Sequence, residues 1–460
     1  MSTEDAAALL VAEDLDAPLA WRDGQPISAR QFLTDAFAQA ERLPARGPVI
    51  NLCVDRYRFA VGLAAGLLRG HLSLLPPNIL PQTLAGLDRH GDGLYILGDG
   101  AALPDVDLPQ LRVPDAAADV RQVHAVPRLL GANPAVCLLT SGSTGAPQPH
   151  VKRWDDLVRN IGAAAARLAE FMQRPDLRGL AIVATVPAQH SYGLESTVLL
   201  AMLGGAAFDA GRPYFPADIV QALRGVPRPR ALVTTPFHLK TLLQSGIELP
   251  PVDLLLSATA PLSPQLAQQA EQAFGGPLVE IYGCTEAGQV ATRRTVAGAQ
   301  WQTLDALTIR REALDDGVTD RFSVSGGHVR EPTPLADILQ LEDPTHFRLL
   351  GRANDLIHVA GKRSSLGHLN FHLNSIDGVL DGAFWLPEEI VDAVVRPIAF
   401  VVAPQLDAAQ IVAALRTRIE AVFVPRRIVF VDALPRETTG KLTAQALRAL
   451  AQARLDGGGR

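Results

Sequence analysis

The residues best suited to chemistry in this 460-residue chain form a run of small hydroxyl and glycine residues, Thr140-Ser141-Gly142-Ser143-Thr144-Gly145. The run follows an apolar stretch typical of a buried strand and precedes an Ala-rich helical pattern. In this setting, backbone amides and hydroxyl groups can approach phosphate oxygens without side-chain bulk in the way. No Gly-Lys-Ser/Thr closes the run, which excludes a Walker-type loop. The run indicates another kind of phosphate-binding loop, although an ordinary Gly/Ser loop has the same composition.

Three more clusters of polar and glycine residues follow in the second half of the chain. They are Tyr282-Gly283-Cys284-Thr285-Glu286, then Gly351-Arg352-Ala353-Asn354-Asp355-Leu356-Ile357 with Gly361-Lys362-Arg363, and Pro435-Arg436-Glu437-Thr438-Thr439-Gly440-Lys441. With the loop, these segments resemble the four ordered signatures of the adenylate-forming superfamily. That superfamily comprises acyl- and aryl-CoA synthetases, firefly luciferase and the adenylation domains of nonribosomal peptide synthetases. One such motif is weak evidence, but four in order over most of the chain are specific.

The resemblance implies ATP-dependent activation of a carboxylic acid. The carboxylate would attack the α-phosphorus of ATP to give acyl-AMP and pyrophosphate, and a thiol would then displace AMP. The expected cofactors are ATP, Mg²⁺ and CoA or phosphopantetheine. Because the transition state gathers negative charge on the phosphates, cations and aimed hydrogen-bond donors are expected to dominate catalysis.

The resemblance also implies roles for single residues. Lys441 would bridge the carboxylate and the α-phosphate, Glu286 would help to hold Mg²⁺, and Thr285 would contact the α-phosphate. His190, in Pro-Ala-Gln-His-Ser-Tyr-Gly, would border the acid pocket. Taken singly, a Thr and a Glu after a strand are more often a helix cap with its first acid, and a lone His is more often structural.

The remaining implied site residues bind the nucleotide or move the second domain. The nucleotide-binding set is Thr140, Ser141, Gly142, Ser143, Thr144, Gly145, Ser257, Ala258, Thr259, Tyr282, Asp337 and Arg352. Asp337 and Arg352 would hold the ribose, although the segment Leu335-Ala336-Asp337 departs from the family's Thr-Gly-Asp. Asn354 would be the hinge, and Gly361 would line the tunnel for the thiol.

Two departures from the family pattern concern charge and the hinge. The lysine that follows the loop proline in the family is Gln148 here, and Lys152 is the nearest lysine. We therefore expect Lys152 to take over the contact with the outer phosphates. At the hinge, Asn354 stands where the family has Asp or Lys, and Asn tolerates unusual backbone dihedrals, as a hinge requires.

The elements that position these residues have the pattern of an α/β protein. Runs rich in Val, Leu and Ile alternate with Ala-rich helical patterns, as in largely parallel sheets that are covered on both faces. The pattern changes near Gly351, after which strands and helices suggest a compact α+β unit. We expect a large N-terminal α/β adenylation domain over residues 1–353 and a small mobile C-terminal domain over residues 354–460.

Composition excludes several other classes of protein. The formal net charge is −6 and no block of Lys or Arg occurs, so neither a nucleic-acid partner nor an anionic membrane surface is indicated. No apolar run reaches the roughly 18 residues of a membrane-spanning helix, and the acidic N-terminus is unlike a signal peptide. Three cysteines cannot form a disulfide framework or a paired zinc motif. A cytoplasmic protein is expected.

Substrate and acceptor remain open among several classes. The short N-terminal part and the Thr140–Trp154 segment resemble compact ligases of bacterial aryl-polyene and xanthomonadin-type pigment pathways. That resemblance implies a hydroxybenzoate-like aryl acid and a separate acyl carrier protein or CoA as acceptor. The alternatives are a ligase for a medium-chain or hydroxy fatty acid, a non-catalytic nucleotide- or acyl-binding relative, and a luciferase-like oxygenase.

Overall fold

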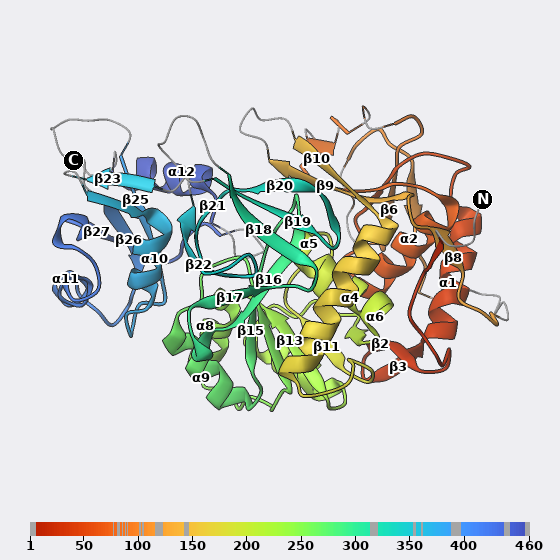
Figure 1. Ribbon diagram of the computed structural model, residues 1–460, viewed down its shortest axis with the longest axis horizontal. Helices are drawn as coiled ribbons and strands as arrows, with labels where there is room; N and C mark the ends of the chain where they lie inside the picture. The colour runs from red at the N-terminus through yellow and green to blue at the C-terminus, as the bar shows by residue number, and fades with distance from the viewer. Residues whose placement is uncertain are drawn as a thin grey trace.

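A computed structural model shows a large domain and, at the opposite end from the N-terminus, a small C-terminal domain (Figure 1). The structure describes residues 6–76, 78–80, 83–84, 86–87, 89, 91–100, 103, 105–115, 123–141, 147–312, 321–352, 356–359, 362–387, 397–436 and 442–455. Within these ranges, no helix combines the length and the apolar character needed to cross a membrane.

Strands of the large domain form two main sheets and two smaller ones in the described part of the chain. The largest sheet has the order β21 (Asp337–Leu341), β22 (His346–Arg352), β17 (Gln300–Thr303), β16 (Gly288–Arg294), β15 (Leu278–Cys284), β14 (Leu254–Ser257), β13 (Arg230–Thr234), β11 (Ala181–Ala184), β12 (Ala207–Asp209), β2 (Pro18–Arg22) and β3 (Gln25–Ser28). The second has the order β10 (Pro147–Arg153), β9 (Pro134–Ser141), β5 (Ser73–Leu75), β4 (Val49–Asn51), β6 (Tyr95–Gly98) and β7 (Gln110–Arg112). The smaller sheets are β18 (Leu307–Glu312) with β19 (Arg321–Gly326) and β20 (Val329–Leu335), and β1 (Ala6–Ala8) with β8 (Arg128–Leu130).

Helices connect these strands and cover the sheets. They are α1 (Ala29–Arg42), α2 (Arg56–Arg69), α4 (Trp154–Phe171), α5 (Ser191–Gly193), the π-helix η3 (Leu194–Val198), α6 (Leu199–Gly204), α7 (Pro216–Gly225), α8 (Pro236–Gln244), α9 (Pro264–Phe274) and the 3₁₀ turn η4 (Thr295–Ala297). The central strands β11, β13 and β14 are buried along their whole length and pair in parallel. Apolar strands need cover on both faces, and the crossover helices supply it. The predicted α/β class is confirmed, with antiparallel strands added at the sheet edges.

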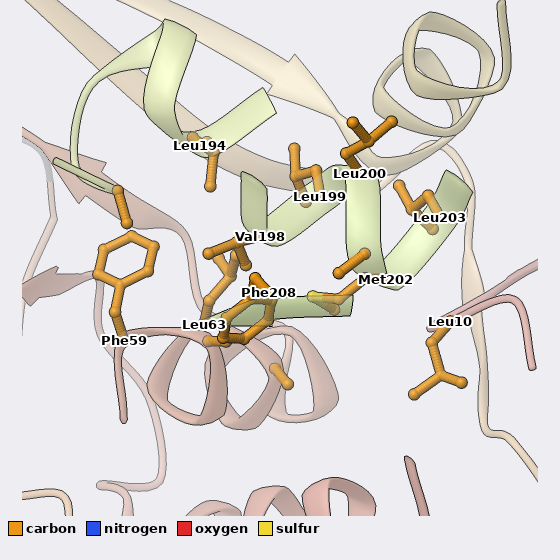
Figure 2. Close-up of a cluster of buried hydrophobic side chains, with 14 of the residues drawn as sticks. Leu10, Phe59, Leu63, Leu194, Val198, Leu199, Leu200, Met202, Leu203 and Phe208 are labelled. Carbon is orange, nitrogen blue, oxygen red and sulfur yellow. The ribbon is translucent and has the colours of Figure 1, made fainter. Parts of the chain in front are cut away.

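The core between the two main sheets fixes the segment that follows β11. In Figure 2, side chains of η3 and α6 face α2, where Phe59 and Leu63 point toward Val198 and Phe208. Phe59, Val198 and Phe208 are completely buried in one apolar cluster. Because such a cluster is closely packed, the chain that enters η3 has little freedom to move.

The phosphate loop differs from the expected strand–loop–helix order. The strand β10 lies before helix α4 and pairs antiparallel with β9 as far as Ser141 and Pro147, and residues 142–146 between the two strands lie outside the described residues. Two prolines, Pro147 and Pro149, lie in β10 and argue against a strand in the sequence. Their lack of an amide donor is tolerated because β10 is the terminal strand of its sheet.

The C-terminal domain has an α+β arrangement close to the expected one. Its elements are β23 (Leu356–Val359), β24 (Lys362–Ser365), α10 (Leu366–Asn374), β25 (Asp381–Trp385), β26 (Ile398–Val402), α11 (Ala408–Arg416), the 3₁₀ turn η6 (Ala421–Phe423), β27 (Ile428–Phe430) and α12 (Ala444–Leu455). Helix α11 ends at Arg416, where the Thr417 hydroxyl and the Arg418 guanidinium both donate to the Ala414 carbonyl. Between the domains, Lys240 of α8 donates to the Asn374 carbonyl at 3.2 Å.

Candidate active site

The predicted ribose-binding residues meet at the edge of the largest sheet. Asp337 begins β21 and Arg352 ends β22, and the antiparallel register pairs these two residues directly. Tyr282, near the end of β15, donates its hydroxyl hydrogen to Asp337 Oδ2 at 2.8 Å. Three residues that are far apart in the sequence are therefore brought together, as a nucleoside site requires.

An aromatic cluster fixes the Tyr282 ring. The ring centroid lies 5.7 Å from that of Trp301 and 5.5 Å from that of Phe347, at tilted and edge-on angles that aromatic pairs favour. Trp301 in turn carries the Arg293 guanidinium 4.5 Å above its ring. The tyrosine is 8% exposed, so its hydroxyl is presented from a rigid base.

The turn that joins β15 and β16 carries Thr285 and Glu286. A side chain at Gly283 would place its Cβ 2.2 Å from the Gly288 carbonyl oxygen, so the glycine of the Tyr-Gly pair allows the two strands to approach. The Glu286 side chain is 44% exposed, and His150 Nε2 lies 3.7 Å from its Oε1. The same His150 nitrogen is 3.1 Å from the Thr140 hydroxyl, which links the phosphate-loop hairpin to the turn.

A magnesium ion fits this turn. The described ranges contain no group of three or more His, Cys, Asp or Glu side chains that could hold a metal. Mg²⁺ commonly takes one or two carboxylates and completes its shell with substrate phosphates and water. The exposed Glu286 carboxylate suits that arrangement, and a bound ion would neutralise charge on the phosphates.

The small-residue segment follows β14 at the same sheet edge. Ser257 is the last residue of β14 and is completely buried, and its hydroxyl has no hydrogen-bond partner among the described residues. Thr259 has a φ of 76°, which turns the chain sharply after the strand. Ala258 packs against the main core. The carboxyl ends of parallel strands are the usual ligand edge of such sheets.

The predicted acid-binding segment leaves the end of β11. A Cβ at Gly193 would lie 1.9 Å from the Pro187 carbonyl oxygen, so this position requires glycine. Tyr192 donates to the Thr234 carbonyl at 3.1 Å, and Gln189 donates to the Cys53 carbonyl. His190 caps α5 and is partly buried.

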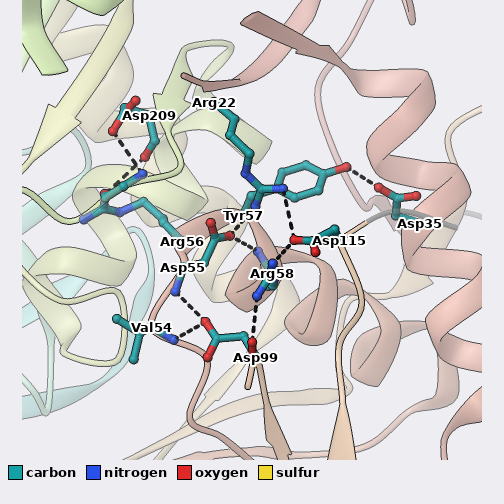
Figure 3. Close-up of polar contacts among 11 residues, drawn as sticks. Arg22, Asp35, Val54, Asp55, Arg56, Tyr57, Arg58, Asp99, Asp115 and Asp209 are labelled. Carbon is teal, nitrogen blue, oxygen red and sulfur yellow. Dashed lines mark hydrogen bonds and ion pairs between the residues drawn. The ribbon is translucent and has the colours of Figure 1, made fainter. Parts of the chain in front are cut away.

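A buried arginine of α2 secures the start of that segment. Arg56 donates to the carbonyls of Ala184 and Val186 at 3.2 and 2.8 Å, and also to those of Asp209 and Gly211. Burial lowers its pKa to about 10. Figure 3 shows Arg56 pointing toward the Asp209 segment, away from the ionic cluster of Asp55, Arg58 and Asp99.

The structure leaves part of the predicted site outside its described residues. This group consists of Gly142, Ser143, Thr144, Gly145, Asn354, Gly361 and Lys441, together with the side chains of Ser141 and Arg352. Lys152 is described, and its ammonium donates to the Glu286 carbonyl.

Sequence reasoning missed three residues that contact the site. They are Arg56, His150 and Glu195, of which Glu195 is 2% exposed and accepts a hydrogen bond from Ser191 at 2.8 Å. Glu195 is the one charged residue between Leu194 and Leu203. A charge inside an apolar helical run is a usable signal, because buried carboxylates are rare unless they are paired.

Comparisons with known proteins agree with this geometry. The family model "AMP-binding enzyme" matches residues 87–308, and "AMP-binding enzyme C-terminal domain" matches residues 387–441. A 4-coumarate–CoA ligase of Rhodobacter capsulatus is 33% identical over 306 residues, which cover 66% of this chain and 73% of that protein. ATP-bound MatB from Rhodopseudomonas palustris has a similar fold, with a TM-score of 0.78, 18% identity and coverage of 96% and 97% of the two chains. The o-succinylbenzoate CoA synthetase of Bacillus subtilis, in complex with its acyl-adenylate, gives a TM-score of 0.77 at 18% identity and covers 94% and 95%.

Proposed function

This chain belongs to the AMP-binding enzyme family and is an acid–thiol ligase, and from that premise we propose that it activates a hydroxybenzoate-like aryl acid. The acid becomes acyl-AMP with release of pyrophosphate, and the acyl group then passes to the phosphopantetheine thiol of an acyl carrier protein or of CoA. The observation that carries the proposal is the cluster of Tyr282, Asp337 and Arg352 beside the Thr285–Glu286 turn.

The nucleotide is bound along one edge of the sheet. Asp337 accepts from the ribose hydroxyls, with Arg352 beside it, and the Tyr282 ring lies against adenine near Ser257, Ala258 and Thr259. The Thr140–Gly145 loop holds the phosphates with its amides and hydroxyls. Glu286 holds Mg²⁺ and Thr285 donates to the α-phosphate, so the charge that develops in the transition state meets donors already in place.

Each of the two chemical steps forms one bond and breaks another. A carboxylate oxygen bonds to the α-phosphorus while the bond from that phosphorus to the bridging oxygen breaks, and pyrophosphate leaves. Lys441 neutralises the two negative groups as they meet. After rotation about Asn354, the thiol sulfur approaches past Gly361 and bonds to the acyl carbon, while the bond from that carbon to the phosphate oxygen breaks. The thiol proton passes to water, and AMP leaves with the electron pair of the broken bond.

Two observations support an aryl acid. The relative that is 33% identical is named for 4-coumarate, which is an aromatic acid. The Thr140–Trp154 segment, with Gln148 and Lys152 in place of the usual loop lysine, resembles ligases of aryl pigment pathways. His190 and Tyr192 would border the ring, and the Tyr192–Thr234 contact would close the pocket.

ATP–pyrophosphate exchange tests the proposal. With Mg²⁺ present and no thiol, we would measure exchange across benzoates, hydroxybenzoates, cinnamates and straight-chain acids. Exchange with hydroxybenzoates supports the proposal, whereas exchange with straight-chain acids alone would establish a fatty acyl ligase instead. Silence from folded protein across the panel would favour a non-catalytic relative. Adding CoA or a phosphopantetheinylated carrier protein then identifies the acceptor.

A further inference from the structure

A group of three buried polar side chains and one half-buried lysine lies beside the Thr285–Glu286 turn, and we call it the polar shell. It consists of Lys152 on β10, Asn160 on α4, Glu195 on η3, and His328 between β19 and β20. Asn160, Glu195 and His328 are 3%, 2% and 8% exposed. Together with Glu286 and Ala287, the polar shell lines a cavity of about 140 Å³.

Three members of the polar shell hold the backbone of the turn. The Lys152 ammonium donates to the Glu286 carbonyl. The backbone of Gln289 lies near the Glu195 carboxylate, and the His328 ring lies near the backbone of Ala287 and Gln289. The turn and the start of β16 are thus approached from one side by three side chains, while the Glu286 side chain is exposed.

Asn160 completes this support by close packing. Gly288 has a φ of +84°, and a Cβ there would lie 2.6 Å from Asn160 Nδ2. No larger residue could occupy this place without moving the turn or Asn160. The turn and the polar shell are therefore in direct contact.

Glu195 also connects the turn to the acid-binding segment. Its carboxylate accepts from the Ser191 hydroxyl at 2.8 Å and from Asn160 Nδ2 at 3.4 Å. Ser191 directly follows His190. Glu195 lies in a π-helix, an irregularity that is frequent at functional sites. One buried carboxylate thus contacts the acid-binding segment directly and the turn through Asn160.

Lys152 and Glu195 carry opposite charges beside the same cavity, which is why we treat them as a pair. A buried carboxylate is costly without a compensating cation, and Lys152 lines the same cavity with the opposite charge. Lys152 favours the charged form of Glu195 electrostatically, so removing either residue changes the electrostatic environment of the other. The two residues should consequently behave as one unit.

We propose that Lys152 and Glu195 are positioning residues that hold the Thr285–Glu286 turn in register with the acid-binding segment at Ser191. Neither residue touches ATP or the acid. The inference rests on the proposed function, in which Thr285 and Glu286 contact the α-phosphate and magnesium. It differs from the expectation that Lys152 reaches the outer phosphates, in that the ammonium here donates to the Glu286 carbonyl.

The test compares Lys152→Met, Glu195→Gln and the double variant. We expect each single change to lower the maximal exchange rate on the order of 10- to 100-fold, since small misplacements of a catalytic group have effects of this size. The double variant should be no slower than the slower single variant, because the residues act together. Matched controls are Arg178→Met and Glu13→Gln, which break an exposed ion pair of 2.7 Å and should leave exchange unchanged.

A second measurement needs neither ATP nor Mg²⁺. Amide hydrogen exchange over residues 285–290 should become faster in both single variants and stay at the wild-type rate in the controls. Should Lys152→Met fail to fold, Ser191→Ala removes one donor to Glu195 and should also speed amide exchange across the turn. Unchanged amide exchange, with only the KM for ATP raised in Lys152→Met and no effect of Glu195→Gln, would overturn the proposal in favour of a direct phosphate contact.

The two proposals can fail separately. A wild-type protein that shows no ATP–pyrophosphate exchange defeats the proposed function, while amide exchange still reports whether Lys152 and Glu195 hold the turn. A wild-type protein that is active, with variants equal to it in both measurements, defeats only the positioning role.

Discussion

At the proposed ribose end of the site, Tyr282 donates directly to Asp337, and the aromatic cluster of Trp301 and Phe347 holds the tyrosine. At the Thr285–Glu286 turn, where the proposed magnesium ion would bind and which we call the magnesium turn, the Glu286 side chain is exposed and its carbonyl accepts from Lys152. The first region is thus supported by residues that would themselves face the nucleotide, and the second by residues that face away from it. Within one site, the residues that face the substrate and the residues that support them can be the same or different. Only the residues that face the substrate are expected to belong to a sequence motif.

The largest effect is expected from a change at Lys441, because adenylation needs both the ribose end and the Thr285–Glu286 turn. Lys441→Ala should lower ATP–pyrophosphate exchange on the order of 100- to 1000-fold, because a group that neutralises transition-state charge is removed. Thioester formation from supplied acyl-AMP should stay near the wild-type rate, since that step follows the loss of pyrophosphate. Both half-reactions are measured on the same preparation, and an unaltered exchange rate would remove Lys441 from the mechanism.

The variant Glu286→Gln changes the Thr285–Glu286 turn alone. The amide keeps the shape of the side chain but loses the charge, so the Mg²⁺ concentration for half-maximal exchange should rise on the order of 10- to 100-fold. Binding of AMP without Mg²⁺ should be unaffected when measured by calorimetry. A fall in AMP affinity of similar size would show that the two regions are not separate.

Asp337→Asn changes the ribose end of the site. Its expected effects are the reverse of those of Glu286→Gln, because AMP binding is affected and the Mg²⁺ requirement is not. Loss of a charged acceptor should weaken AMP binding by about 10-fold, which corresponds to about 1.4 kcal/mol. The Mg²⁺ requirement should remain that of the wild type. Titration calorimetry with AMP and an Mg²⁺ titration of exchange distinguish this result from a general loss of folding.

The smallest effect is expected from Tyr282→Phe. The ring keeps its place in the aromatic cluster, and only the hydrogen bond to Asp337 is lost, at a cost of about 1 kcal/mol or about a 5-fold loss of AMP affinity. Combined with Asp337→Asn, the effects should be less than additive, because the two residues share the bond. Full additivity would mean that the tyrosine hydroxyl contacts the nucleotide independently of Asp337.

Much of this arrangement could be predicted from the sequence. Buried strands such as Leu254–Ser257 are almost wholly apolar, and the family resemblance grouped Asp337 with Arg352, which the β21–β22 register places opposite each other. The strand β10 could not be predicted in the same way, because Pro147 and Pro149 oppose strand propensity and only its terminal position in the sheet permits them.

The polar shell was harder to predict for a different reason. Lys152, Glu195 and His328 come from β10, η3 and the β19–β20 turn, so no local spacing connects them. Their shared role follows from tertiary packing around a backbone turn, which leaves no pattern along the chain. The charge of Glu195 within an apolar run is the one signal that sequence alone supplies.

The prolines of β10 have a consequence beyond the site. The outer edge of a terminal strand can recruit a strand from another molecule, which begins intermolecular sheet growth. A proline offers no amide hydrogen, so two of the seven residues of β10 cannot donate to an incoming chain. Pro147 and Pro149 therefore make the hairpin that carries the phosphate loop a poor template for aggregation while the protein is newly made and concentrated.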